Sequence, residues 1–130
     1  MYSKKTFDSK VFKNKDFTKE SFEGSRLSDC TFLNCNLSNV SFSQASPQGV
    51  VFKGCKILGV DFSRCNTLLL DFTFDHSTIS MSTFSALNLK GVLFDSCEVF
   101  DCDFIQTNLS NSDFKNSNLR GSRFQNCDLS

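Results

Sequence analysis

The sequence has few of the residues on which many folds and binding sites depend. It contains no tryptophan, one tyrosine, one proline and one histidine in 130 residues, and its 14 basic residues balance its 14 acidic ones. Zero net charge argues against a nucleic-acid grip built on bulk positive charge. No apolar run is long enough to span a membrane, and the start MYSKKTF lacks the apolar stretch of a signal peptide. We therefore expect one cytoplasmic domain without membrane association or direct nucleic-acid binding.

Catalytic and metal-binding motifs are missing as well. The sequence contains no nucleophile elbow and no glycine-rich phosphate loop, and its histidine is not part of a motif that pairs it with a nucleophilic side chain. The seven cysteines form no CxxC pair that could hold zinc with the single His76. The sequence thus predicts no catalytic residue, no metal and no cofactor, and we expect a protein that is not an enzyme.

Phenylalanine is abundant, with 16 residues, and it follows a five-residue rhythm. The end of the chain can be written as the rows CDFIQ, TNLSN, SDFKN, SNLRG, SRFQN and CDLS. The third residue of each row is a large apolar residue, here called the core position, and the first is a small residue, here called the inner slot. The core positions of these rows are Phe104, Leu109, Phe114, Leu119, Phe124 and Leu129.

A period of five excludes a helix and an uninterrupted strand, since neither keeps every fifth side chain on one face. The pattern fits short extended segments separated by corners, where each corner turns the chain so that the next large apolar side chain again points inward. Four such sides would close a square coil of about twenty residues, and successive coils would stack about 4.8 Å apart. The sequence therefore predicts a coiled, all-β chain of about six coils.

Rows such as TNLSN, SNLRG and CDLS resemble the A(D/N)LXX motif of the pentapeptide-repeat family, and the resemblance covers residues 25–130. It implies a right-handed quadrilateral parallel β-helix. It says less about function, because one repeat scaffold serves many roles.

Residues 1–24 depart from the rule at the inner slots. The core positions are phenylalanines, but the inner slots hold long charged residues: Lys5, Lys10, Lys15 and Glu20. Because such side chains do not fit an interior slot, we interpret the segment as an atypical N-terminal coil or cap. A basic arm that binds a partner is the alternative interpretation.

Two further irregularities lie in the middle of the chain. Pro47 falls at a core position and predicts a bulged turn, because proline cannot donate a ladder hydrogen bond. The rhythm then shifts by two residues, so we place a two-residue insertion between 63 and 68 and take Leu69 as the next core residue. Four side-chain columns follow: Phe22, Phe42, Phe62, Phe84, Phe104 and Phe124; Phe32, Phe52, Phe74, Phe94 and Phe114; Leu27, Leu69, Leu89, Leu109 and Leu129; Leu37, Ile57, Ile79, Val99 and Leu119.

The repeat also accounts for the cysteines. Six of the seven occupy inner slots, where a free thiol behaves as a small buried apolar group. Cys65 falls in the insertion and is the expected exposed thiol. Cys35 and Cys55 would lie one coil apart on the same column, so a disulfide stays open as an alternative to reduced thiols.

One surface segment breaks the polar rule and is the predicted partner patch. It combines apolar residues at outward positions with a local excess of acids, a mixture suited to protein binding. The alternative is that Phe100 folds against a neighbouring corner. The patch comprises Leu93, Asp95, Glu98, Phe100, Asp101, Asp103 and Ile105.

The preferred functional hypothesis is a non-enzymatic protein-binding or structural scaffold of unknown partner, with a possible homodimer through an uncapped C-terminal coil. The alternative, by resemblance only, is a Qnr-type protein that mimics DNA, binds DNA gyrase or topoisomerase IV and protects against quinolones. Such mimicry needs a negative surface. Here the first 26 residues hold seven basic and four acidic side chains, and the last 41 hold six acidic and four basic.

Overall fold

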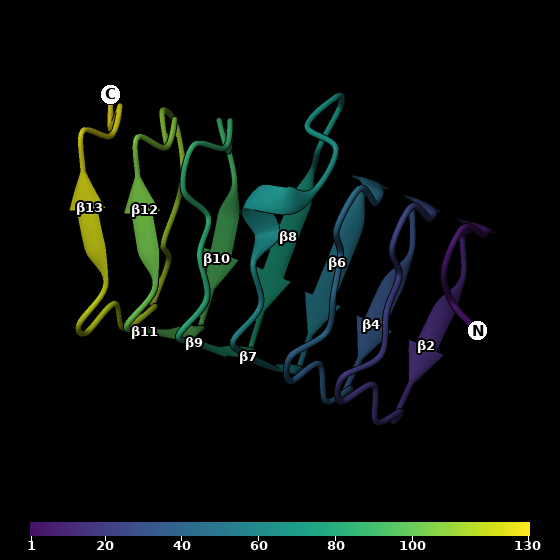
Figure 1. The fold of residues 1–130 in the computed structure, drawn as a ribbon. Coiled ribbons are helices and arrows are strands. Elements are labelled where there is room, and N and C mark those ends of the chain that lie inside the picture. Colours follow the sequence, from purple (N-terminus) through teal and green to yellow (C-terminus); the bar gives the residue numbers. More distant parts are fainter.

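The computed structural model describes residues 1–130 as a β-solenoid of short parallel strands (Figure 1). Its one helical element is the 3-10 turn η1 (Phe62–Arg64). The strands are β1 (Thr6–Asp8), β2 (Val11–Lys13), β3 (Arg26–Ser28), β4 (Thr31–Leu33), β5 (Ser46–Gln48), β6 (Val50–Lys53), β7 (Lys56–Leu58), β8 (Phe72–Asp75), β9 (Thr78–Ser80), β10 (Leu93–Asp95), β11 (Glu98–Phe100), β12 (Asp103–Ile105) and β13 (Arg123–Gln125). The prediction of an all-β parallel solenoid of about six coils is confirmed.

The strands form four sheets, each of which makes one side of the coil. Their orders are β1-β3-β5, β2-β4-β6-β8-β10, β7-β9-β11 and β12-β13. Core positions lie directly above one another, as in the pairs of Phe12 with Phe32 and Phe32 with Phe52. Neighbouring strands therefore come from successive coils, which is why sequence segments one coil apart share a side.

The corners depend on a residue in the left-handed region. In a typical corner, the Glu20 N–H donates to the carbonyl of Phe17 at 2.8 Å, and Lys19 between them has a φ of 61°. This combination is that of a type II turn. The turn reverses the facing of the chain, so that the next core position again points inward. A period of five arises because each short strand and its turn together use five residues.

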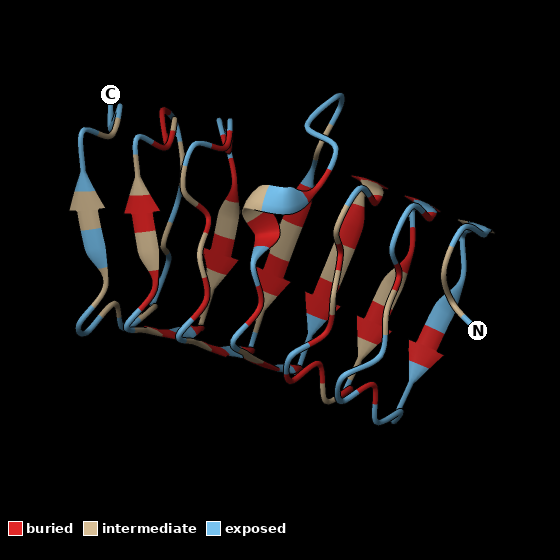
Figure 2. Ribbon diagram, in the orientation of Figure 1, coloured by how far each residue is buried: buried red, intermediate tan, exposed pale blue.

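The core is built on two columns of stacked phenylalanines. Buried residues recur along the strands of successive coils (Figure 2). Within one column the centroids of Phe84 and Phe104 lie 5.0 Å apart, and in the other those of Phe74 and Phe94 lie 4.6 Å apart. Between the columns the rings meet edge to face, as Phe84 and Phe94 do at 88°. Offset and edge-to-face packing add to the stabilisation that burial supplies. Both predicted phenylalanine columns are confirmed, and Phe12 extends the second one.

The inner slots favour serine, threonine and cysteine because these side chains donate across coils. The Thr107 hydroxyl donates to the carbonyl of Phe84 at 3.0 Å, and the Cys35 thiol to that of Phe12 at 3.2 Å. All seven cysteines are free, so Cys35 and Cys55 form no disulfide. The expectation for Cys65 is wrong: its residue is only 6% exposed, because it still occupies an inner slot of the preceding register.

The first coil places its charged inner-slot residues in solvent. Phe12, Phe17 and Phe22 are buried, whereas Lys5, Lys10, Lys15 and Glu20 are exposed. No described coil lies beneath these four side chains, so they are not forced into the interior. Tyr2 covers the phenylalanines of this coil, with its ring centroid 5.1 Å from those of both Phe17 and Phe22.

Two predictions for the middle of the chain are wrong. Pro47 forms no bulge: it lies within β5 and pairs with Leu27 in the ordinary register. Leu69 is not a core residue, since it is 66% exposed with a φ of 60°. The old register persists to Asn66, whose N–H donates to Ala45, and the new one begins at Phe72, which pairs with Val50.

Candidate functional site

The main departure from the regular solenoid is the turn at residues 67–70, which projects above β8 in Figure 1. Its closing hydrogen bond runs from the Leu70 N–H to the Thr67 carbonyl at 3.4 Å. The turn presents Leu68 and Leu69 to solvent with exposed fractions of 74% and 66%. Because neighbouring leucines rarely stay so exposed without a partner, this turn is a candidate binding element.

A groove lies beside the turn, on the outer face of β3 and β5. Its volume is about 220 Å³. Arg26 lines it and forms no ion pair within the protein. The groove thus combines apolar and hydrogen-bonding surface with an available cation. The residues of this loop groove are Arg26, Ser28, Ser46, Gln48, Asn66, Leu68 and Leu69.

Pro47 and Phe72 explain why the turn leaves the solenoid here. Pro47 has no N–H to donate to a strand in the next coil, so the ladder of β5 is weak on that side. Phe72 occupies an inner slot that is otherwise held by a smaller residue, and it is 3% exposed. Its ring centroid lies 5.3 Å from that of Phe62 and 5.7 Å from that of Phe52. Phe72 therefore fills the interior that Leu69 leaves.

The seven residues of the predicted partner patch do not gather on one surface. Leu93 and Asp95 lie on β10, Glu98 and Phe100 on β11, and Asp103 and Ile105 on β12. These strands belong to three different sheets, with Asp101 at the corner between the last two. A single flat partner would meet only part of the set.

Two members of the patch are engaged within the protein. The Arg120 guanidinium lies 4.5 Å from the centroid of the Phe100 ring, a cation–π contact that covers this aromatic side chain. Arg123 donates to both carboxylate oxygens of Asp103, at 2.8 and 3.0 Å. This hydrogen bonding lowers the pKa of Asp103 below its ordinary value. Their availability to a partner is correspondingly reduced.

A second concavity, of about 360 Å³, follows the corner between β11 and β12. Asp61, Asp101 and Asp103 line it together with Met81, which is 69% exposed. The sequence analysis missed Met81. The available signal was an apolar residue two places after a core position, where the corners of this chain mostly hold Asn, Gly or another polar residue.

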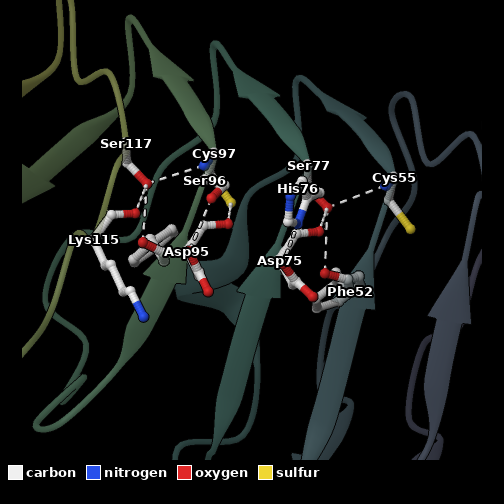
Figure 3. A network of polar contacts seen from close by, with 11 residues as sticks. Phe52, Cys55, Asp75, His76, Ser77, Asp95, Ser96, Cys97, Lys115 and Ser117 are labelled. Atoms are coloured by element: carbon white, nitrogen blue, oxygen red, sulfur yellow. Dashed lines mark hydrogen bonds and ion pairs between the residues drawn. The ribbon is translucent and has the colours of Figure 1, made fainter.

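The inner-slot serines bind backbone groups of neighbouring coils, as Figure 3 shows for the buried Ser77 and the half-buried Ser117. The Ser77 hydroxyl donates to the Phe52 carbonyl at 3.2 Å and accepts from the Cys55 N–H at 3.0 Å. Ser117 makes the equivalent bonds with Phe94 and Cys97. His76 instead contacts the Asp75 carboxylate, through Nδ1 at 2.5 Å. These serines therefore tie coils together, and no histidine acts on them.

No group of three or more histidine, cysteine or acidic side chains is arranged to hold a metal ion. None of the helical structure is long and apolar enough to cross a bilayer.

The fold defines a parallel β-solenoid assembled from five-residue repeats. The chain belongs to the pentapeptide-repeat family, because the model of the pentapeptide repeat region matches residues 25–100 and that of eight pentapeptide repeats matches residues 100–130. No curated protein matches the sequence. The protein is therefore a repeat scaffold of this family.

Solved structures resemble the chain at low identity. QnrB1, a plasmid-mediated fluoroquinolone resistance protein in its trypsin-treated form, is 18% identical, with a TM-score of 0.45 over 99% of this chain and 84% of that one. HetL, from the cyanobacterium Nostoc sp. strain PCC 7120 and involved in heterocyst differentiation regulation, is 14% identical, with a TM-score of 0.42 over 91% and 56%. A pentapeptide repeat protein of the cyanobacterium Cyanothece 51142 is 8% identical, with a TM-score of 0.40 over 98% and 92%. These similarities concern the fold and assign no role.

Proposed function

We propose that this protein is a non-enzymatic scaffold that binds a protein partner through the loop groove. The single observation that carries the proposal is the exposure of Leu68 and Leu69 beside that groove. Burying a leucine side chain at an interface contributes about 1.5 to 3 kcal/mol to the free energy of binding. A partner that covers both leucines would therefore gain substantial affinity.

The chemistry of the groove defines the partner. The two leucines would pack against an apolar side chain of the partner. Arg26 would bind a carboxylate of the partner, because a guanidinium binds a carboxylate through two hydrogen bonds. Ser28, Ser46 and Gln48 add hydrogen-bonding groups on the floor. The proposed partner is thus a protein segment with an apolar residue close to an acidic one. We place the encounter in the cytoplasm, a location that the seven free thiols support.

The test is cross-linking through a photoreactive amino acid at position 67, which is exposed directly before Leu68 and leaves Arg26 in place, followed by affinity measurement with the recovered partner. The double variant Leu68→Ser/Leu69→Ser should weaken binding by roughly 100-fold, as expected for the loss of about 3 kcal/mol of apolar contact. Met81→Ser is the matched control, since it removes an exposed apolar side chain from another corner and should leave the affinity unchanged. Equal losses in both variants would contradict the proposal.

No specific observation favours the Qnr-type alternative. DNA mimicry depends on a continuous negative surface, whereas Arg123 on β13 forms an ion pair with Asp103 on β12. A gyrase supercoiling assay with quinolone, run with and without the protein, is expected to show no protection.

A further inference from the structure

The solenoid lacks one rung on the side built from β1, β3 and β5. Four backbone groups there have no hydrogen-bond partner in the protein: the N–H of Gly49, the N–H and the carbonyl of Asn88, and the carbonyl of Lys90. In the next coil the equivalent groups are all bonded. Asn108 donates to Leu87 at 3.0 Å, Leu89 donates to Asn108 at 2.8 Å, and Gly91 donates to Ser110 at 2.8 Å. The unpaired groups therefore outline the place of one absent strand.

The segment 67–71 carries the groups that would complete this rung. When Leu69 is placed twenty residues before Leu89, as Leu89 stands before Leu109, the bonds of the next coil can be copied backwards. Asn88 would then donate to Thr67, Leu69 to the Asn88 carbonyl, and Asp71 to the Lys90 carbonyl. Gly49 would donate to Leu70. All four open groups are then satisfied by residues 67–71; of the two N–H donors required from this segment, that of Asp71 would exchange its present bond to the Pro47 carbonyl, at 3.3 Å, for the one to Lys90.

One side chain opposes this closure. Leu69 at a core position would need the interior that Phe72 fills, 5.3 Å from Phe62 between ring centroids. The other buried inner slots hold nothing larger than the leucine at Leu87, and most hold valine or a smaller residue, as at Val50 and Val92. Leu69 and Phe72 thus compete for one space. The present arrangement has its own cost, since Leu69 adopts a left-handed φ of 60° and stays exposed.

We propose that residues 67–71 form a strap with two positions, open as described and closed as the missing strand, and that Leu69 and Phe72 exchange places between them. The inference goes beyond partner binding and does not depend on it. Closure would nevertheless withdraw Leu69 from the loop groove, so a partner that binds the groove would select the open form.

The test is amide hydrogen exchange, measured residue by residue on the full chain. Phe72→Val removes the competitor and introduces a side chain that this slot accepts elsewhere. We expect exchange at Asn88 and Gly49 to slow by roughly 10-fold or more in this variant. Adding Leu69→Asn should restore fast exchange, because asparagine does not replace leucine in the core. Asn108, bonded in both positions of the strap, is the internal control.

Each outcome is decisive. Fast exchange at Asn88 in Phe72→Val, with Asn108 still protected, overturns the proposal, and so does slow exchange that persists in the double variant. If Phe72→Val loses protection at Asn108 as well, the wild type is compared with Leu69→Asn alone. Slower exchange at Asn88 in the wild type then supports the strap, and equal rates overturn it.

Discussion

The ring of Phe84 lies parallel to that of Phe104 within 9°, with centroids 5.0 Å apart, although 20 residues separate the two in the sequence. Phe84 makes the same kind of contact with Phe62 on its other side, at 4.7 Å. It is fully buried. The aromatic column is therefore continuous through the middle of the molecule.

Replacing Phe84 by alanine should lower the free energy of unfolding by about 3 to 5 kcal/mol, because the cavity lies between two rigid coils that cannot collapse into it. Urea denaturation checks this value. Phe124→Ala is the matched control: Phe124 stacks on one side only and is partly exposed, so its loss should be smaller. Equal effects at the two sites would count against a column that stabilises through its stacked interior.

Tyr2 is expected to hold the first coil in place. Its ring packs against four phenylalanines, including Phe17 and Phe22 at 5.1 Å. Tyr2→Ala should cost about 1 to 3 kcal/mol and should accelerate amide exchange in residues 5–24. Tyr2→Phe should behave like the wild type. A uniform acceleration across all coils in the alanine variant would refute a local role.

The buried thiols should make the protein sensitive to alkali. Burial raises the pKa of Cys55 and of Cys102 to about 11, and that of Cys65 to about 12. In the unfolded chain these thiols ionise near their ordinary pKa, so the unfolded state loses protons first as the pH rises. The free energy of unfolding that depends on these thiols is therefore fully present below about pH 9, and it decreases as the pH rises above that value. Thermal melts between pH 8 and pH 10.5 measure the fall.

Cys55→Ser/Cys102→Ser should reduce this alkaline loss, because serine does not ionise and donates the same kind of bond at Ser77 and Ser117. Thiol labelling with an aromatic disulfide at pH 8 is a second readout. Cys127, the one cysteine that is not fully buried, should react first. Fast labelling of Cys65 would contradict its buried position.

The ion pair of Asp103 and Arg123 should be visible in the titration of the carboxyl group. Hydrogen bonds from Arg123 lower the pKa of Asp103, so Arg123→Ala should raise that pKa toward its ordinary value. Carboxyl chemical shifts followed by NMR between pH 2 and pH 6 would measure the change. Arg120→Ala is the control, since Arg120 lies over Phe100 instead. Thermal stability should hardly change, because the pair is largely exposed.

The repeat predicts most of the fold because each pentad adopts the same local conformation, a short strand followed by a turn. Phe84 and Phe104 could be placed in one column from their spacing alone, as could the buried cysteines of the inner slots. Leu69 could not. It satisfies the alternation of phenylalanine with leucine, but the pattern does not reveal that Phe72, in a slot that holds smaller residues elsewhere in the core, occupies the same interior space.

The candidate site was harder to predict for a related reason. Sequence order suggested that Leu93, Phe100 and Ile105 lie together, yet three successive short strands face three different directions. The cation that covers Phe100 comes from Arg120, one coil later in the chain. The loop groove likewise joins Arg26 to Leu68. Such contacts across coils follow from the stacking register, which the shift near residue 67 alters.

The change of register between Asn66 and Phe72 leaves the following coils undisturbed. Phe52 and Phe74 are separated by 22 positions in the chain, and their rings still stack at 5.1 Å. Each layer thus responds only to the layers directly above and below it. Extra amino acids at a corner are absorbed where they occur, which gives this architecture room to acquire new protruding segments during evolution while its aromatic spine stays intact.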